Sequence, residues 1–190
     1  RRHRRGVRRR PGQRDAARRA VEQAREQVAA ALDADPSEVI FTASGSEANN
    51  LLIRGFADAL RTEGAATTRL ACTQIEHPCV AEPLRALARS GWDVSEVAVN
   101  ASGVVERSSM TALPMDTWLV SVMSANNETG ALQPVADLGA AFKRDRHDMT
   151  CFHTDAVQAL GKHPLSFRKL NTAGVDALTV SGHKIGGPKG

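Results

Sequence analysis

Residues 175–184 read VDALTVSGHK, an apolar run that ends in a cluster of polar residues. The β-branched residues in this run favour a β-strand. The apolar pattern breaks at Gly182 and leaves Ser181, His183 and Lys184 together at its end. Parallel sheets hold their ligands at the carboxyl ends of their strands. The stretch therefore predicts a strand that delivers a lysine to a binding site.

Earlier parts of the chain repeat this pattern of a β-prone run that leads to a polar residue. The runs are residues 38–42 leading to Ser46, residues 70–75 leading to His77, residues 118–124 leading to Asn127, and residues 151–155 ending at Asp155. Residues 93–99 alternate as an edge strand does. Helical patterns, over residues 15–34, 47–60, 78–87 and 132–142, separate these runs. The alternation predicts an α/β fold, a mainly parallel sheet flanked by helices, with its polar strand ends in one crevice.

The stretch ASGSE, residues 43–47, lies between a predicted strand and a helix with apolar residues at Leu51, Leu52, Phe56 and Leu60. Backbone N–H groups and the dipole at a helix N-terminus attract phosphate, and Ser44 or Ser46 would add a hydroxyl. An ordinary helix cap, with help from Glu47, explains the same residues. The stretch taken alone leaves both interpretations open.

Length and composition indicate a globular protein. The chain has 190 residues, of which 42% are hydrophobic, enough for one sizeable core. No apolar run approaches the roughly 20 residues of a membrane span, so we expect a soluble, cytoplasmic protein without a membrane partner. Cys72, Cys79 and Cys151 form neither a CxxC pair nor a dense framework. We therefore expect free thiols, with Cys72 and Cys151 buried in strands, and no metal site.

The basic residues concentrate at the start of the chain. The net charge is +4, and arginine occupies seven of the first ten positions. We expect residues 1–14 to form a basic, disordered tail and residues 15–190 to form the domain. Aromatic residues are 4% of the chain and tyrosine is absent, which leaves little for stacking on bases. Nucleic acid is therefore not expected as a partner.

The polar strand ends together match the needs of pyridoxal phosphate. The Ser46 stretch would bind its phosphate, His77 would lie beside its ring, and Asp155 would pair with its ring nitrogen. Lys184 would react with its aldehyde, because lysine is the residue that forms Schiff bases. Each residue taken singly has another explanation. His77 could equally be a solvated loop residue, and the cluster around Asn127 could be a hydrogen-bonded turn. Asp155 could be a carboxylate that orients a helix. The ordered set favours the cofactor.

The same stretches resemble the pyridoxal-phosphate-dependent cysteine desulfurases, in the class V aminotransferase group of fold-type I, which also includes selenocysteine lyases. The residues that carry the resemblance are FTASGSEANN at 41–50, EHP at 76–78, ANNETG at 125–130, HTDAVQ at 153–158 and SGHK at 181–184. Their order and spacing cover residues 15–190. The resemblance implies a partial large, cofactor-binding domain that is truncated after the Schiff-base lysine.

By resemblance, each of these residues has a role at the cofactor. Lys184 would hold pyridoxal phosphate and move the substrate Cα proton, and His77 would stack on the ring and take part in proton transfer. The resemblance implies that the phosphate is bound by Gly45, Ser46, Ser181 and His183. Asp155 would pair with the ring nitrogen, and Gln158 would form a hydrogen bond with the ring hydroxyl. Asn127 would contact the cofactor and the substrate carboxylate.

The resemblance implies a cysteine desulfurase, which takes sulfur from L-cysteine and leaves L-alanine and an enzyme persulfide. The sulfur would pass to acceptor proteins for iron–sulfur cluster or thio-cofactor synthesis, and the enzyme would be a homodimer. None of Cys72, Cys79 and Cys151 stands at the family's nucleophile position, which lies beyond residue 190. The family's opening strand and substrate loop are also missing from this sequence, which agrees with a fragment.

Two other functions fit the sequence. Selenocysteine lyase shares the cofactor residues and differs in the cysteine loop that these 190 residues lack. A non-catalytic remnant, binding a partner through the basic tail, would carry the same residues without using them.

Overall fold

The computed structural model describes residues 11–65 and 67–188, with side chains from Arg14 onward. Residues 1–40 and residues 41–190 form two separate compact units. The first contains helix α1 (Pro11–Leu32) and the 3₁₀-helix η1 (Pro36–Glu38). Most of the predicted tail lies outside the described residues. Residues 11–14 were wrongly placed in it: they belong to α1, which begins at a proline, a residue that the first turn of a helix accepts.

The second unit is built on five parallel strands in the order β2-β1-β3-β4-β5. The strands are β1 (Arg69–Thr73), β2 (Asp93–Val97), β3 (Thr117–Ser121), β4 (Cys151–Asp155) and β5 (Ala177–Thr179). All four neighbouring pairs are parallel, and β2 lies at an edge, so the predicted fold class is confirmed.

One predicted strand does not form. Residues 36–38 make the 3₁₀ turn η1, and residues 39–42 follow without regular structure. The Asp35 N–H donates to the Glu38 carboxylate at 2.7 Å, which favours the turn over an extended backbone. Ile40 is 74% exposed, so this β-prone run has no sheet to pack against.

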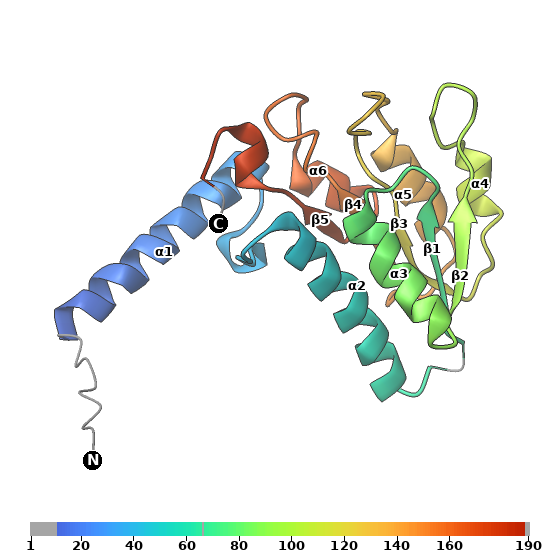
Figure 1. The fold of residues 1–190 in the computed structure, drawn as a ribbon, viewed down its shortest axis with the longest axis horizontal. Helices are drawn as coiled ribbons and strands as arrows, with labels where there is room; N and C mark the ends of the chain where they lie inside the picture. The colour runs from blue at the N-terminus through green and yellow to red at the C-terminus, as the bar shows by residue number, and fades with distance from the viewer. Residues whose placement is uncertain (1–10, 66, 189–190) are drawn as a thin grey trace, which may run out of the picture. The chain divides into compact units, whose positions relative to one another are not determined.

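Helices cover both faces of the sheet (Figure 1). They are α2 (Gly45–Thr62), α3 (Pro78–Arg89), α4 (Arg107–Thr111), α5 (Val135–Lys143) and α6 (Phe167–Thr172). The 3₁₀-helix η2 (Gly182–Ile185) follows β5. The sequence predicted α2, α3 and α5. It missed α4 and α6, which have five and six residues, too few to show a helical period.

Alternate residues along the strands build two separate cores. Leu70, Leu119 and Cys151 pack with residues of α2 and α3. Their neighbours Ala71, Val120 and Phe152 pack with residues of α4, α5 and α6. Burying one large apolar side chain contributes about 1.5–3 kcal/mol, so both layers stabilise the sheet substantially. The period of two also directs Asp155, four residues after Cys151, to the face that carries α2 and α3.

Cys72 and Cys151 are buried in the α2/α3 layer, as the sequence predicted. Burial raises the pKa of each thiol to about 12. Both cysteines therefore remain protonated near neutral pH and act as small apolar residues.

The strand order places a topological switch point between β1 and β3. The chain runs from β1 to β2 on one side and then returns to β3 on the other side of β1. Connections diverge at such a point and open a crevice at the carboxyl ends of the two strands. The residues that follow β1 and β3 therefore flank the most favourable place for a ligand. Among the described residues, no helix is both long and apolar enough to cross a membrane.

Gly174 turns the chain from α6 into β5 with a φ of +94°. A Cβ at this position would lie 2.7 Å from Lys143 Cγ and 3.1 Å from the Gly139 carbonyl oxygen. We expect Gly174→Ala to lower the free energy of unfolding by about 2 kcal/mol in urea denaturation, because it adds a clash to a left-handed backbone. Gly64→Ala is the control, since Gly64 has a φ of +70° and open space around it. Equal losses in the two variants would exclude a contribution from the clash.

Candidate active site

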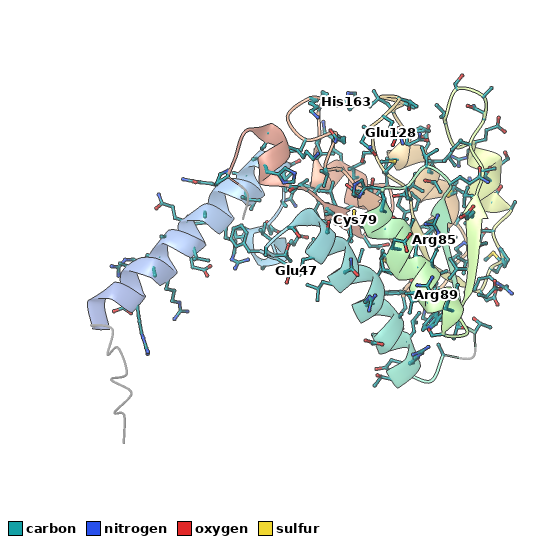
Figure 2. All side chains as sticks on the ribbon, viewed as in Figure 1. Glu47, Cys79, Arg85, Arg89, Glu128 and His163 are labelled. Carbon is teal, nitrogen blue, oxygen red and sulfur yellow. The ribbon has the colours of Figure 1, made fainter. Side chains whose placement is uncertain are left out.

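The N-terminus of α2 is capped by Ser44 and not by Ser46. Ser44 Oγ accepts the Glu47 N–H at 3.1 Å, and the Glu47 carboxylate accepts the Ala43 N–H at 2.6 Å. Ser46 is exposed beside them (Figure 2 labels Glu47 at the same helix end). Because Ser44 provides the cap, the Ser46 hydroxyl is available to a ligand. The cap and the phosphate site are therefore compatible in this helix of 18 residues.

Gly45 brings the start of α2 against the end of β5. A Cβ on Gly45 would lie 3.5 Å from Ser181 Cβ and 3.3 Å from Val157 Cγ2. Ser181 in turn lies 2.8 Å from His183, between Oγ and Nδ1. Residues from the two ends of the unit, which the sequence assigns to one phosphate site, are therefore neighbours.

Lys184 lies on η2, directly after the buried Ser181. Its backbone N–H donates to the Ser181 carbonyl oxygen at 3.2 Å, and its side chain is exposed. Gly186 ends the turn with a φ of +88°. The fold thus places the lysine at the carboxyl end of β5, as the sequence predicted.

Asp155 is a buried carboxylate, 5% exposed, at the carboxyl end of β4. Its Oδ1 accepts the Val157 N–H at 3.0 Å, and its Oδ2 accepts an amide hydrogen of Asn49 at 2.8 Å. Among the described residues it forms no ion pair. A buried carboxylate with only neutral donors favours a cationic partner, because burial penalises an uncompensated charge.

His77 is the N-cap of α3. Its Nδ1 accepts the Cys79 N–H at 3.2 Å, so the neutral ring carries its hydrogen on Nε2. Cys79, labelled at the start of α3 in Figure 2, places its Sγ 2.9 Å from the same nitrogen. The Cys79 Sγ also lies 3.7 Å from Asp155 Oδ2. One thiol therefore joins the two residues that the sequence places around a cofactor ring.

The loop after β3 separates the roles of two neighbouring asparagines. Asn126 Oδ1 accepts the N–H groups of Glu128 and Thr129 at 3.0 and 2.9 Å. Its amide nitrogen donates to the Ile75 carbonyl oxygen at 3.1 Å, which ties this loop to the one after β1. Asn126 thus forms the turn across the switch point, and Asn127 is exposed next to it.

Gln158 lies apart from the hydrogen-bonded cluster around Asp155. It is half-buried, and its Oε1 accepts a hydrogen bond from Lys162 at 2.6 Å. Val157 contacts the Gly45 position and binds Asp155, and Cys79 contacts both Asp155 and His77. Asn127 and Gln158 lie in the segments that follow β3 and β4, and Lys184 lies on η2 after β5.

Sequence reasoning missed Asn49, Cys79 and Glu76. Glu76 is buried, and its Oε1 accepts the Thr73 hydroxyl at 2.7 Å and the Met123 N–H at 2.6 Å. Burial raises the pKa of Glu76 to about 7, with a smaller contribution from the charge of Asp155. Asn49 had a usable signal, because it falls one helical turn after Gly45 and one before Ile53. In the residues described here, no group of three or more His, Cys, Asp or Glu side chains is arranged as a metal site.

Comparison with known proteins gives a consistent result. A family model described as aminotransferase class-V matches residues 3–190. The mitochondrial cysteine desulfurase of Drosophila melanogaster is 43% identical over 90% of this chain and 35% of its own length. Cysteine desulfurase IscS of Dictyoglomus turgidum is 41% identical over 91% of this chain and 42% of its own length. The chain thus spans well under half the length of these curated relatives.

Solved structures show the same relationship. A NifS-like protein superimposes with a TM-score of 0.85 at 39% identity, covering 92% of this chain and 46% of its own. SspA in complex with cysteine superimposes with a TM-score of 0.82 at 38% identity, covering 93% of this chain and 48% of its own. DndA from Streptomyces lividans superimposes with a TM-score of 0.82 at 40% identity, covering 97% of this chain and 50% of its own. The chain belongs to the class-V aminotransferase family, and these curated relatives within it are cysteine desulfurases.

Proposed function

We propose that this chain is the lysine-bearing part of a pyridoxal-phosphate-dependent cysteine desulfurase. The observation that carries the proposal is the buried Asp155 carboxylate, which is held only by neutral donors. It is linked to His77 through Cys79 and to the Gly45–Ser181 contact through Val157. The names of the relatives and the SspA complex with cysteine favour cysteine over selenocysteine as the substrate.

The residues present fit the cofactor. A protonated pyridine nitrogen is the cation that a buried Asp155 lacks among the described residues, and the capped N-terminus of α2 suits a phosphate. When bound, pyridoxal phosphate supplies an aldehyde that bonds to amines and a ring that takes up the electrons released at the substrate Cα.

The residues of this chain would bind, orient and move protons around the cofactor. Gly45 and Ser46 would hold the phosphate together with Ser181 and His183, and Gln158 would bind the ring hydroxyl. Asn127 would contact the cofactor and the substrate carboxylate from the loop after β3.

Two of these residues would handle protons. Lys184 would hold the cofactor through its amine and then accept the proton from the Cα of L-cysteine. His77 would keep a hydrogen on Nε2, since its Nδ1 accepts the Cys79 N–H.

Sulfur transfer needs an acceptor thiolate. The carbon–sulfur bond of L-cysteine breaks, the sulfur joins the acceptor as a persulfide, and L-alanine leaves. Burial raises the pKa values of Cys72 and Cys151 to about 12 and also raises that of Cys79. These values support an acceptor cysteine outside residues 1–190. A homodimer, sulfur-acceptor proteins for iron–sulfur cluster or thio-cofactor synthesis, and a cytoplasmic location belong to the same proposal.

The test is to locate the bound cofactor. We expect the protein to develop a visible absorbance band with pyridoxal phosphate, and borohydride to fix the cofactor covalently to Lys184. Peptide mapping by mass spectrometry identifies the modified lysine. A cofactor fixed to several exposed lysines, with no preference for Lys184, would contradict the proposal and favour a non-catalytic remnant.

A further inference from the structure

Asn49 is a polar residue on the buried stripe of α2. This stripe contains Gly45, Asn49, Ile53, Ala57 and Leu60. Asn49 is fully buried, with an exposed fraction of 0%. A buried amide costs free energy unless it is hydrogen-bonded, so an apolar residue would be the ordinary choice at this position.

Both hydrogens of the Asn49 amide have partners. The amide nitrogen lies 2.8 Å from Asp155 Oδ2 and 3.1 Å from Cys79 Sγ. Rotating the amide by half a turn would place its oxygen against the carboxylate, so Asp155 determines the orientation. The Asn49 Oδ1 atom then has no hydrogen-bond partner within the described part of the chain. The position therefore retains a donor to Asp155 at the cost of an unpaired oxygen.

The hydrogen bond from Asn49 completes the fixation of Asp155. Val157 binds one carboxylate oxygen through its backbone N–H, and Asn49 binds the other. Two donors on different oxygens prevent the carboxylate from rotating, while Oδ1 keeps a second lone pair. We propose that Asn49 is a positioning residue, which holds Asp155 in the orientation that receives the ring N–H of pyridoxal phosphate. The inference rests on the proposed function and deepens it.

Cys79 extends this arrangement to His77. Its Sγ lies 3.1 Å from the Asn49 amide nitrogen and 2.9 Å from His77 Nδ1. Burial raises the pKa of the Cys79 thiol, so the thiol stays protonated between that ring nitrogen and Asp155 Oδ2. Asn49 therefore contacts Asp155 at the end of β4 directly, and it is linked through Cys79 to His77 in the segment after β1.

The test compares two ligands that differ at one ring atom. Pyridoxal phosphate has a pyridine nitrogen, and its 1-deaza analogue has a C–H group there. We expect Asn49→Leu to weaken binding of pyridoxal phosphate to the full chain about tenfold, the effect of one hydrogen bond to a charged group. Binding of the analogue should be unchanged, because Asp155 has no ring N–H to receive from it. Fluorescence titration with each ligand measures the ratio of the affinity for pyridoxal phosphate to the affinity for the analogue.

Asn50→Leu is the matched control. Asn50 donates to the Ser46 carbonyl oxygen at 2.9 Å, within α2, and the same change there should leave the ratio of the two affinities unchanged. Asn49→Ala removes the donor without adding apolar bulk, so it serves if Asn49→Leu does not fold, with the same expected ratio. Equal weakening of both ligands by the Asn49 variants would show a merely structural role and overturn the inference. If the unmodified chain binds neither ligand, the proposed function fails and the inference fails with it.

Discussion

Lys184→Ala is expected to abolish the borohydride-stable attachment of pyridoxal phosphate. Lys184 follows the buried Ser181 at the carboxyl end of β5, where the contact with Gly45 brings the start of α2. No other side chain type in the proposed site can bond covalently to the aldehyde in this way. Mass spectrometry of the reduced protein should therefore find no cofactor on the variant, while weak reversible binding through the phosphate persists.

Lys169→Ala is the control for this result, because Lys169 is also exposed but lies on α6. It should retain full attachment at Lys184. If Lys184→Ala still carried the cofactor, on Lys162 for instance, the assignment of Lys184 would be wrong. Circular dichroism of both variants separates a lost attachment site from a lost fold.

The sequence predicted the parallel sheet because buried strands have a composition that surface segments lack. β3 lies in the nearly continuous apolar run of residues 118–124, and β3 and β4 are both buried on both faces. Residues 38–42 show the limit of such a prediction. Val39, Ile40 and Phe41 favour strands only where neighbours cover them, and Ile40 and Phe41 are 74% and 46% exposed. β-Propensity thus identified a strand where packing did not provide one.

The helix patterns show a similar limit. Leu51, Leu52, Phe56 and Leu60 predicted the helix α2, yet Leu51 is 55% exposed. The buried stripe runs through Gly45, Asn49, Ile53, Ala57 and Leu60, so only Leu60 belongs to both sets. A hydrophobic pattern cannot identify Gly45 and Asn49, because glycine and asparagine do not count as apolar. The residue that the pattern excluded, Asn49, is the one that contacts Asp155.

The sequence proposes candidate site residues where the chemistry requires one residue type, and it cannot propose residues that act through other residues. A lysine after a strand, an aspartate at a strand end and a serine at a helix start each have a chemical reason that sequence shows. Cys79 and Glu76 depend on contacts between separate strands and helices. Glu76, for example, binds the Met123 N–H at the end of β3. No spacing in the sequence reveals that contact.

Two buried titratable residues, Glu76 after β1 and His153 on β4, give the stability opposite dependences on pH. Burial raises the pKa of Glu76 from 4.5 to about 7, so the folded state keeps a proton that the unfolded state loses between these values. Stability from this group therefore falls as the pH rises from 4.5 to 7. Burial lowers the pKa of His153 from 6.5 to about 4, and its ring contacts Ser121 and Thr179. Stability from His153 therefore falls as the pH drops from 6.5 to 4.

Each effect amounts to about 3 kcal/mol, since one pKa unit corresponds to about 1.4 kcal/mol. The opposite changes of stability with pH from Glu76 and His153 nearly cancel between pH 4.5 and 6.5, so the stability of the wild-type chain reveals neither of them. Glu76→Gln removes one of them and keeps an acceptor for Thr73 and Met123. We expect the stability of Glu76→Gln relative to wild type to increase by about 3 kcal/mol from pH 4.5 to pH 8. Urea denaturation across this range measures the difference.

His153→Gln is the counterpart with the opposite sign. It loses packing and at least one of the hydrogen bonds to Ser121 and Thr179, so its stability is lower at every pH. The pH dependence of the difference is the informative quantity: the variant should lose least, relative to wild type, at pH 4 and most above pH 6.5. A difference between Glu76→Gln and wild type that stays constant with pH would show that Glu76 is already ionised in the fold. In that case an unpaired charge would lie near Asp155, and the cationic partner that Asp155 requires would have to compensate both carboxylates.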